Sequence, residues 1–385
     1  MMKIDKITII LIIIFILVIV GIGFLFNYFL RETKIPELKE ETKIKPEVGI
    51  LKEVLETTTE AQKLATETEE TVTKTEAKEE AEEEKKEVYR VFYKNPILTF
   101  KIYKDKLYFY DLKEKTLSYY SFQNDLVIPI YKNEKVVDVI WGPNDNLFLF
   151  KLWQDNKISF LILDVLEDSV YNLSNDIREI NFLDKNFVAH IKTENQDYFA
   201  LLDKKGKILK KIKDVSFEEI KIVPIDKNNF LVFELPSNKV SSYIWIYNTN
   251  GFSKILTNES TGVFALPVLS NQVLVNKIEN TIETKIIDLK GKTIKILPEV
   301  LAIEKCTNYS DLVCAIGPEV DLDSWYFYKT AAENDEIFVY SSKKNDFTTF
   351  KLEKSFDILY PQILDKKIYF IDKNSWDLYE YEISF

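Results

Sequence analysis

Hydrophobic and polar residues follow three different patterns along this chain of 385 residues. Residues 7–30 are apolar and carry no charge, whereas residues 31–86 are mostly charged or polar. From residue 87 to residue 385, short runs rich in Val, Ile, Tyr, Phe and Leu alternate with polar turns. The patterns therefore predict a short tail (1–6), an apolar segment (7–30), a linker (31–86) and one large domain (87–385).

The apolar segment has the length of a membrane-spanning helix. At a rise of ~1.5 Å per residue, its 24 residues cross a hydrocarbon core of ~30 Å. A cleaved signal peptide is the alternative, but its apolar region is about 7 to 15 residues long and ends in a small-x-small site. This segment instead ends Tyr28-Phe29-Leu30-Arg31. We therefore expect a retained transmembrane helix.

The charges that flank the helix leave its orientation open. Lys3 and Lys6 precede it, and five basic residues follow it in the linker: Arg31, Lys34, Lys39, Lys43 and Lys45. A count of positive charges would place the large domain in the cytoplasm, but that rule applies poorly to domains of this size. A short tail before one long apolar stretch resembles a bacterial signal anchor. We therefore expect a single-pass protein of the cell membrane with an extracytoplasmic domain.

The linker has the composition of an unfolded spacer. Residues 31–87 contain 18 glutamates, 11 lysines or arginines, 10 threonines and no aromatic residue. Such a segment cannot bury enough apolar surface to offset the loss of chain entropy. We expect a disordered or frayed-helical stalk, which as a coil spans roughly 40 Å.

Residues 87–385 have the pattern of an all-β domain. The apolar runs have strand length, and turns such as Asn144-Asp145-Asn146 separate them. Similar blocks begin at nearly constant intervals, close to 40 residues: Pro96, Val136, Ile177, Phe217, Val263, Leu301 and Phe356. A repeat of about this length, with four strands per unit, is typical of a β-propeller. We predict seven blades, with six or eight as alternatives, and no helix.

The two ends of this domain predict how the ring closes. Lys106–Asp111 near its beginning has a counterpart in Lys367–Asp372 near its end. The last block shows only three strands, and Glu87–Tyr93 is a spare strand before the first block. We predict that the spare strand completes the last blade.

One hairpin carries a resemblance to a known family. Trp141-Gly142-Pro143-Asn144-Asp145 follows an apolar strand and resembles the Trp-Ser-Pro-Asp-Gly hairpin of TolB-like and WD-repeat-like bacterial propellers. Gly142 and Asp145 depart from that pattern. A second hairpin, Glu304-Lys305-Cys306 to Cys314-Ala315, resembles a blade of membrane-anchored bacterial propellers. The resemblance implies a binding scaffold more than an enzyme, since fold alone does not determine function.

The sixth block contains two candidate features. Cys306 and Cys314 flank a predicted turn, and a hairpin would place them opposite each other within reach of a disulfide; two buried free thiols are the alternative. The block is also about 15 residues longer than the others, and the extra stretch contains Trp325, Tyr326 and Tyr328. These aromatic residues are candidates for contact with a partner, or they fold back and cover the blade edge.

Composition argues against several classes of site. The chain has a net charge of −11, one histidine and nine glycines, which disfavours nucleic-acid binding, His-rich metal centres and glycine-lined phosphate sites. His190 lies in an alternating strand without an evident nucleophile. Asp321 and Asp323 lack the glycine and glutamate of a calcium loop. We expect no catalytic residue, cofactor or metal.

We therefore expect a membrane-anchored, extracytoplasmic propeller that binds a protein or an envelope polymer without catalysis. A propeller enzyme, such as a glycan lyase or hydrolase with carboxylates in its central channel, is one alternative. A ligand sensor is the other, although six residues before the helix offer little with which to signal.

Overall fold

The computed structural model describes residues 89–269, 271–278, 281–308, 311–317, 321–327 and 334–383. The predicted tail (1–6), transmembrane helix (7–30) and linker (31–86) lie outside these residues. Within the described part of the chain, no helix is long and apolar enough to cross a membrane.

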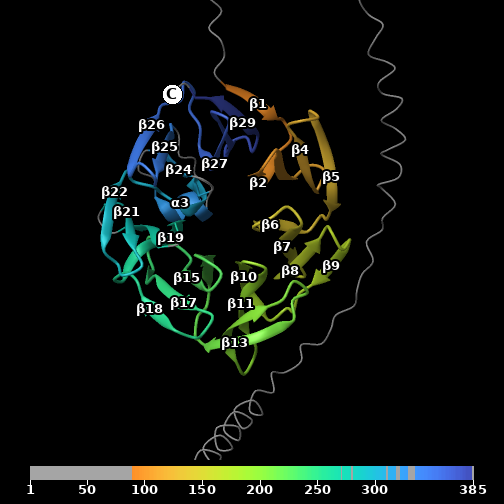
Figure 1. Ribbon diagram of the computed structural model, residues 1–385, viewed down its shortest axis with the longest axis vertical. Coiled ribbons are helices and arrows are strands. Elements are labelled where there is room, and N and C mark those ends of the chain that lie inside the picture. The colour runs from red at the N-terminus through yellow and green to blue at the C-terminus, as the bar shows by residue number, and fades with distance from the viewer. Residues whose placement is uncertain are drawn as a thin grey trace, which may run out of the picture. The chain divides into compact units, whose positions relative to one another are not determined.

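Seven antiparallel sheets stand around a ring, and each forms one blade (Figure 1). In the first three blades the strands follow one another from the inside of the ring outward. Blade 1 contains β2 (Ile97–Tyr103), β3 (Lys106–Asp111), β4 (Thr116–Ser121) and β5 (Leu126–Lys132). Blade 2 contains β6 (Val136–Trp141), β7 (Leu147–Gln154), β8 (Lys157–Asp164) and β9 (Ser169–Asn172). Blade 3 contains β10 (Ile177–Leu183), β11 (Asn186–Lys192), β12 (Asp197–Leu202) and β13 (Ile208–Asp214).

The next three blades repeat this order. Blade 4 contains β14 (Ile220–Pro224), β15 (Asn229–Glu234), β17 (Trp245–Asn248) and β18 (Ser253–Ile255). Blade 5 contains β19 (Ser260–Leu269), β20 (Gln272–Ile278), β21 (Ile282–Asp288) and β22 (Thr293–Leu297), and β16 (Ser241–Ser242) adds a short fifth strand. Blade 6 contains β23 (Cys306–Asn308), β24 (Leu312–Ile316), β25 (Glu336–Ser341) and β26 (Asp346–Phe350).

The chain's first described strand closes the ring, as predicted. Blade 7 contains β27 (Ile358–Leu364), β28 (Lys367–Asp372) and β29 (Leu378–Glu382), and β1 (Tyr89–Tyr93) pairs with β29 as its outer strand. Figure 1 shows orange β1 beside dark blue β29. The Arg90 guanidinium reinforces the pairing, because its Nε donates to Glu380 Oε1 at 3.1 Å.

Aromatic and aliphatic side chains fill the space between blades, which explains the continuous apolar runs of the middle strands. Tyr108 and Tyr110 of β3 share one buried cluster with Phe148 and Phe150 of β7. The rings of Tyr108 and Phe148 lie 5.7 Å apart. A strand buried on both faces needs apolar residues at successive positions rather than at alternate ones.

Side chains of the inner strands also join neighbouring blades. Lys101 Nζ donates to the Gly142 carbonyl at 2.6 Å, and Asn181 Nδ2 donates to the Ile222 carbonyl at 2.8 Å. Gln362 of β27 exchanges two hydrogen bonds with the backbone of β2, at residues Phe100 and Ile102. Since adjacent inner strands do not pair with each other, these bonds help to fix the ring's inner wall.

The structure differs from the sequence-based expectation in one helix and in the starts of the fourth, fifth and sixth blocks, whose inner strands begin at Ile220, Ser260 and Cys306. The extra residues of the sixth block contain a short helix, α3 (Leu322–Phe327), which no helical spacing predicts. The fourth block was placed at Phe217, but its inner strand starts at Ile220. The shift has a simple cause: residues 215–219 form the connection from β13 to β14, and Phe217 is apolar because it packs against the core between blades 3 and 4.

Candidate functional site

One equivalent position in four inner strands is occupied by a polar residue. Thr99, Asp138, Glu179 and Tyr360 each lie two residues after the buried aliphatic residue that begins the strand. A β-bulge at this point interrupts the pairing of all four strands with their neighbours. Bulges redirect side chains, so the position is suited to present a side chain toward the axis. In blade 4, Lys221 follows Ile220 directly, one position earlier in its strand and without a bulge.

These groups form an electrostatically coupled cluster, which we call the axial cluster: Asp138, Glu179, Lys221, Glu304, Tyr326 and Tyr360. Burial raises the pKa of Glu179, although Lys221 and Lys151 oppose the shift. The Lys151 amine lies 3.7 Å from Glu179 Oε2. Burial alone would lower the pKa of Lys221, but Glu179, Asp138 and Glu304 outweigh it and raise the pKa. Lys221 is therefore a cation held among three carboxylates.

Glu304 connects the axial cluster to α3. It lies in the short 3-10 turn Ile303–Lys305 before β23, and Tyr326 of α3 donates a hydrogen bond to its carboxylate. Burial raises the pKa of Glu304, and Lys221 and the Tyr326 hydroxyl act in the opposite direction. Burial and the neighbouring carboxylate also keep the pKa of Tyr326 well above its ordinary value. The tyrosine is thus a neutral donor at neutral pH.

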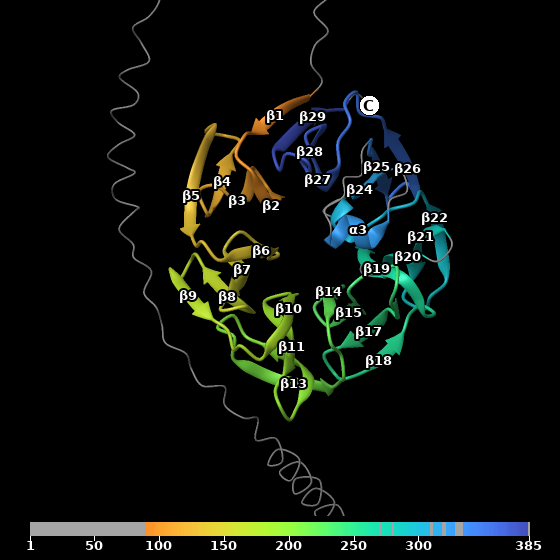
Figure 2. The same cartoon turned by 180° about the vertical axis from the view of Figure 1, so that it is seen from behind.

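The long connection of blade 4 holds the first turn of α3. Asp321 caps the helix, because its Oδ2 accepts the Ser324 amide at 2.8 Å. Asn238 donates from its side chain to Asp321 at 2.6 Å and from its backbone to Asp323 at 3.0 Å. The capping residue Asp321 is thus held by a residue more than 80 positions away. In the two opposite views, α3 lies inside the ring of blades (Figures 1 and 2).

A buried ionic network holds the other side of α3 on blades 6 and 7. The Trp325 indole donates to Asp357 Oδ2 at 3.2 Å, and Lys373 Nζ lies 3.7 Å from the centre of the indole ring. Lys305 pairs with both Asp335 and Asp357, and all three side chains are at most 1% exposed. The helix therefore contacts blades 4, 6 and 7, and Tyr326 joins it to the axial cluster.

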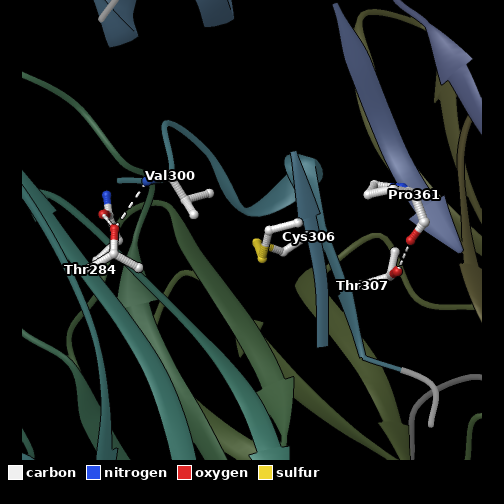
Figure 3. Close-up of a disulfide and its surroundings, with 7 residues drawn as sticks. Thr284, Val300, Cys306, Thr307 and Pro361 are labelled. Carbon is white, nitrogen blue, oxygen red and sulfur yellow. Dashed lines mark hydrogen bonds between the residues drawn. A yellow bond between two sulfur atoms is a disulfide. The ribbon is translucent and has the colours of Figure 1, made fainter. Parts of the chain in front are cut away.

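The two cysteines lie opposite each other in blade 6 and form a disulfide. Cys306 of β23 is the register partner of Cys314 of β24, and their sulfur atoms are 2.08 Å apart. In Figure 3 the disulfide lies between Thr284 on one side and Thr307 on the other, and each threonine forms a hydrogen bond with the backbone of a neighbouring segment. Thr284 accepts the Val300 amide at 3.1 Å, and Thr307 donates to the Pro361 carbonyl of blade 7. Both cysteines belong to the buried apolar cluster between blades 5 and 6.

The aromatic candidates of the insertion have internal partners. Trp325 is only 3% exposed, and half-buried Tyr326 faces Glu304. Tyr328 lies outside the described residues. In this conformation Trp325 covers the blade, as the alternative interpretation holds, and contact between these aromatic residues and a partner stays a prediction.

The other polar residues considered from the sequence have structural partners as well. His190 is fully buried, its Nε2 lies 2.6 Å from Asp197 Oδ1, and burial lowers its pKa. Asp321 and Asp323 bind the blade 4 connection. Within the described residues, no group of three or more His, Cys, Asp or Glu side chains is arranged to hold a metal ion.

Sequence reasoning did not identify the axial cluster. The signal was present, since Asp138, Glu179 and Lys221 are 41 and 42 residues apart and follow equivalent strand starts. An alignment of these three charged residues with one another, rather than of the block starts, would have shown it. The links from Glu304 to Tyr326 and from Lys305 to its two aspartates depend on the insertion's path and have no signal in the sequence.

Comparison with solved structures supports the fold. Virginiamycin B lyase from Staphylococcus aureus is 10% identical, and the match covers 77% of this chain and 100% of that chain with a TM-score of 0.53. The Cps50 (Swd1) β-propeller domain from Myceliophteria thermophila is 9% identical, with 77% and 100% coverage and a TM-score of 0.50. At these identities the likeness shows a seven-bladed propeller fold and nothing about activity.

The structural similarity to TolB is lower than that to these two proteins. TolB from Acinetobacter baumannii is 11% identical and has a TM-score of 0.43, which is too low to support an argument. The match covers 62% of this chain and spans 60% of the length of TolB. No protein-family model and no curated protein matches the sequence.

Proposed function

We propose that this protein is a membrane-anchored, extracytoplasmic scaffold that binds a protein or an envelope polymer through the face that carries α3. The observation that supports this proposal is the attachment of α3 to blades 4, 6 and 7. The four strands of blade 6 pair with one another, and the insertion between β24 and β25 adds no strand to them. The insertion is therefore not needed to complete the blade. Loops that a rigid fold holds in place are where binding residues are concentrated.

Two parts of the chain support this location. The uncharged segment 7–30 supports membrane anchoring. The disulfide between Cys306 and Cys314 supports an extracytoplasmic domain, because disulfides persist in oxidising compartments and are rare in the cytosol.

Site-specific photocrosslinking in intact cells tests this function. A benzophenone amino acid replaces Val240, which is 57% exposed in the blade 4 connection beside α3. Leu126 is the matched control, because it is 46% exposed on the outer strand of blade 1. We expect a discrete adduct from position 240 and none from position 126. Equal adducts from both positions, or none from position 240, would contradict the proposal.

A propeller enzyme is the second candidate, and the axial cluster favours it. Carboxylates with raised pKa values around a lysine are typical of catalytic sites, although structural ion networks produce the same shifts. Glu179→Gln and Glu304→Gln test this candidate against cell-envelope glycans as substrates. Cleavage that wild-type protein performs and both variants lose would favour the enzyme over the scaffold.

A further inference from the structure

One side of the ring's outer edge carries a concentrated positive charge. We call it the basic rim, and it comprises the last turn and outer strand of blades 3 to 6: residues 203–214, 248–255, 288–296 and 342–350. These residues include twelve lysines and four aspartates, for a net charge of +8. Blade 3 alone contributes the run Lys204-Lys-Gly-Lys-Ile-Leu-Lys-Lys-Ile-Lys213.

The rest of the domain is acidic, so the rim is a charge asymmetry rather than part of a basic protein. Of the chain's net charge of −11, residues 1–30 carry +1 and residues 31–87 carry −7, which leaves −5 for residues 88–385. With +8 on the basic rim, the remainder of residues 88–385 carries −13. Such a separation of charge gives the domain an electrostatic field that favours one orientation, with the basic rim toward an anionic surface.

Contacts between neighbouring blades show that the rim is continuous. Lys210 Nζ of blade 3 lies 3.5 Å from Asn250 Oδ1 of blade 4, and Lys254 Nζ of blade 4 lies 3.5 Å from the Lys290 carbonyl of blade 5. Lys295 Nζ of blade 5 then lies 3.4 Å from the Asn345 carbonyl of blade 6. In Figure 1, β13, β18, β22 and β26 follow one another along the outside of the ring. Because all blades share one strand order, their last turns lie on the same face.

The aspartates that begin two of the rim's turns accept hydrogen bonds from backbone amides. Asp203 Oδ1 accepts the amides of Lys205 and Lys207 at 2.8 and 2.9 Å. Asp288 Oδ1 accepts the amides of Lys290 and Lys292 at the same distances. The two turns therefore hold their carboxylates inward while these four lysines are exposed.

Large apolar side chains are exposed between the lysines. Ile296 is 71% exposed, Phe252 is 59% exposed and Leu209 is 48% exposed. Phe347 of β26 is 37% exposed, and the Lys295 amine lies 5.7 Å from the centre of its ring. Exposed apolar side chains thus lie among the lysines of the rim in four consecutive blades.

We propose that the basic rim docks on an anionic lipid surface, with its lysines at the head groups and its apolar side chains in the interface. Each lysine near such a surface contributes about 1 kcal/mol, and exposed apolar side chains add affinity by entering the head-group region. A hydrated polyanion would engage the lysines but would gain nothing from Phe252 or Ile296. This inference goes beyond the scaffold function, because it concerns how the ring lies on the membrane and not what α3 binds.

The experiment uses the full chain with an environment-sensitive nitrobenzoxadiazole label at Phe252→Cys. The native cysteines form a disulfide and do not compete for the label. Vesicles of phosphatidylcholine alone are compared with vesicles that contain about 30% phosphatidylglycerol, an anionic lipid. A label at Trp153→Cys is the control. Trp153 is 51% exposed and lies before the turn between β7 and β8, at the end of blade 2 opposite to its last turn. It is therefore on the face of the ring away from the turns of the basic rim.

We expect the label at position 252 to brighten and shift to the blue only with anionic vesicles, and to return to its starting spectrum at about 1 M salt, where the Debye length is about 3 Å. The label at position 153 should not respond. Combined replacement of four rim lysines by glutamate should reduce the docked fraction more than about tenfold: Lys205, Lys207, Lys290 and Lys292. The matched control replaces four exposed lysines outside the rim: Lys113, Lys132, Lys135 and Lys157.

Each other outcome overturns the proposal. An equal response with neutral vesicles would mean that charge plays no part, and no response with either vesicle would mean that the rim does not dock. A blue-shifted signal in the absence of lipid that disappears when residues 31–86 are deleted would assign the rim to the acidic linker instead. Flotation of the chain with neutral vesicles reports on the segment 7–30 separately, so a failure of the membrane anchor is distinguishable from a failure of the rim.

Discussion

Lys305 offers a sharp test of how α3 is held. Its amine lies between the carboxylates of Asp335 and Asp357, and none of the three side chains reaches solvent appreciably. Lys305→Met keeps the volume of the side chain but leaves Asp335 without its cation, whereas Asp357 still has Lys373 at 4.0 Å. Removal of one partner from a buried pair typically costs about 3 to 5 kcal/mol.

An exposed pair in the same blade provides the control. Lys351 lies 3.2 Å from Glu336, but its side chain is 84% exposed. Since exposed pairs contribute about 0 to 1 kcal/mol, Lys351→Met should have little effect on the free energy of unfolding. The difference between the two variants isolates burial as the cause.

Urea unfolding of the full chain in a mild detergent measures both variants. Tryptophan fluorescence is a suitable probe, because Trp325 donates a hydrogen bond to Asp357 within the network. Burial already raises the pKa of Asp335, so a loss of Lys305 raises it further, and the deficit should shrink as the pH falls and Asp335 takes up a proton. A loss below about 1 kcal/mol for Lys305→Met, or a deficit independent of pH, would refute the reasoning.

Three further predictions concern other parts of the ring. Replacement of both Cys306 and Cys314 by Ala should cost about 2 to 3 kcal/mol by loop closure, measured by urea unfolding; no loss would contradict a bond formed in the native protein. Burial alone would raise the pKa of Glu380, but hydrogen bonds from Lys367, Arg90 and Tyr369 outweigh it and lower the pKa. Its contribution is therefore complete above the ordinary glutamate pKa of about 4.3 and disappears as the pH falls through the lowered value, so Glu380→Gln should be less stable than wild type at pH 7 and equal to it in strong acid. Gly142→Ser, which introduces the residue usual in TolB-like hairpins, should cost about 1 to 3 kcal/mol, because a Cβ there would lie 2.8 Å from the Leu147 carbonyl and 3.0 Å from the Phe182 ring; a thermal melt unchanged from wild type would disprove this.

The repeat made most of the fold predictable. The two matching segments at the ends of the domain coincide with β3 and β28, and the spare strand before the first block is β1. Blades are built from local hairpins, so the order of apolar runs and turns carries nearly all the information that the ring requires. The steric need for Gly142 was not visible, because Phe182 comes from the next blade.

The candidate site was predictable only in part. The disulfide pairing follows from a local hairpin, so the sequence was sufficient for it. The helix α3 depends on contacts with Asn238, Asp357 and Lys373, which are far away in the sequence. Its own six residues make fewer than two helical turns, which is too short to indicate a helical period. Tertiary contacts thus determine both the helix and the burial of Trp325.

The closed ring is the claim on which the axial cluster, the α3 face and the basic rim all depend. Arg90→Cys combined with Glu380→Cys tests it most directly, since these residues are register partners across β1 and β29. Arg90→Cys combined with Leu209→Cys is the control, because β13 lies across the ring from β1 (Figure 1). After oxidation and digestion, mass spectrometry should find a disulfide-linked peptide that joins residues 90 and 380 in the monomer, and none that joins residues 90 and 209. A monomer without the first link would contradict closure of the ring by its own first strand.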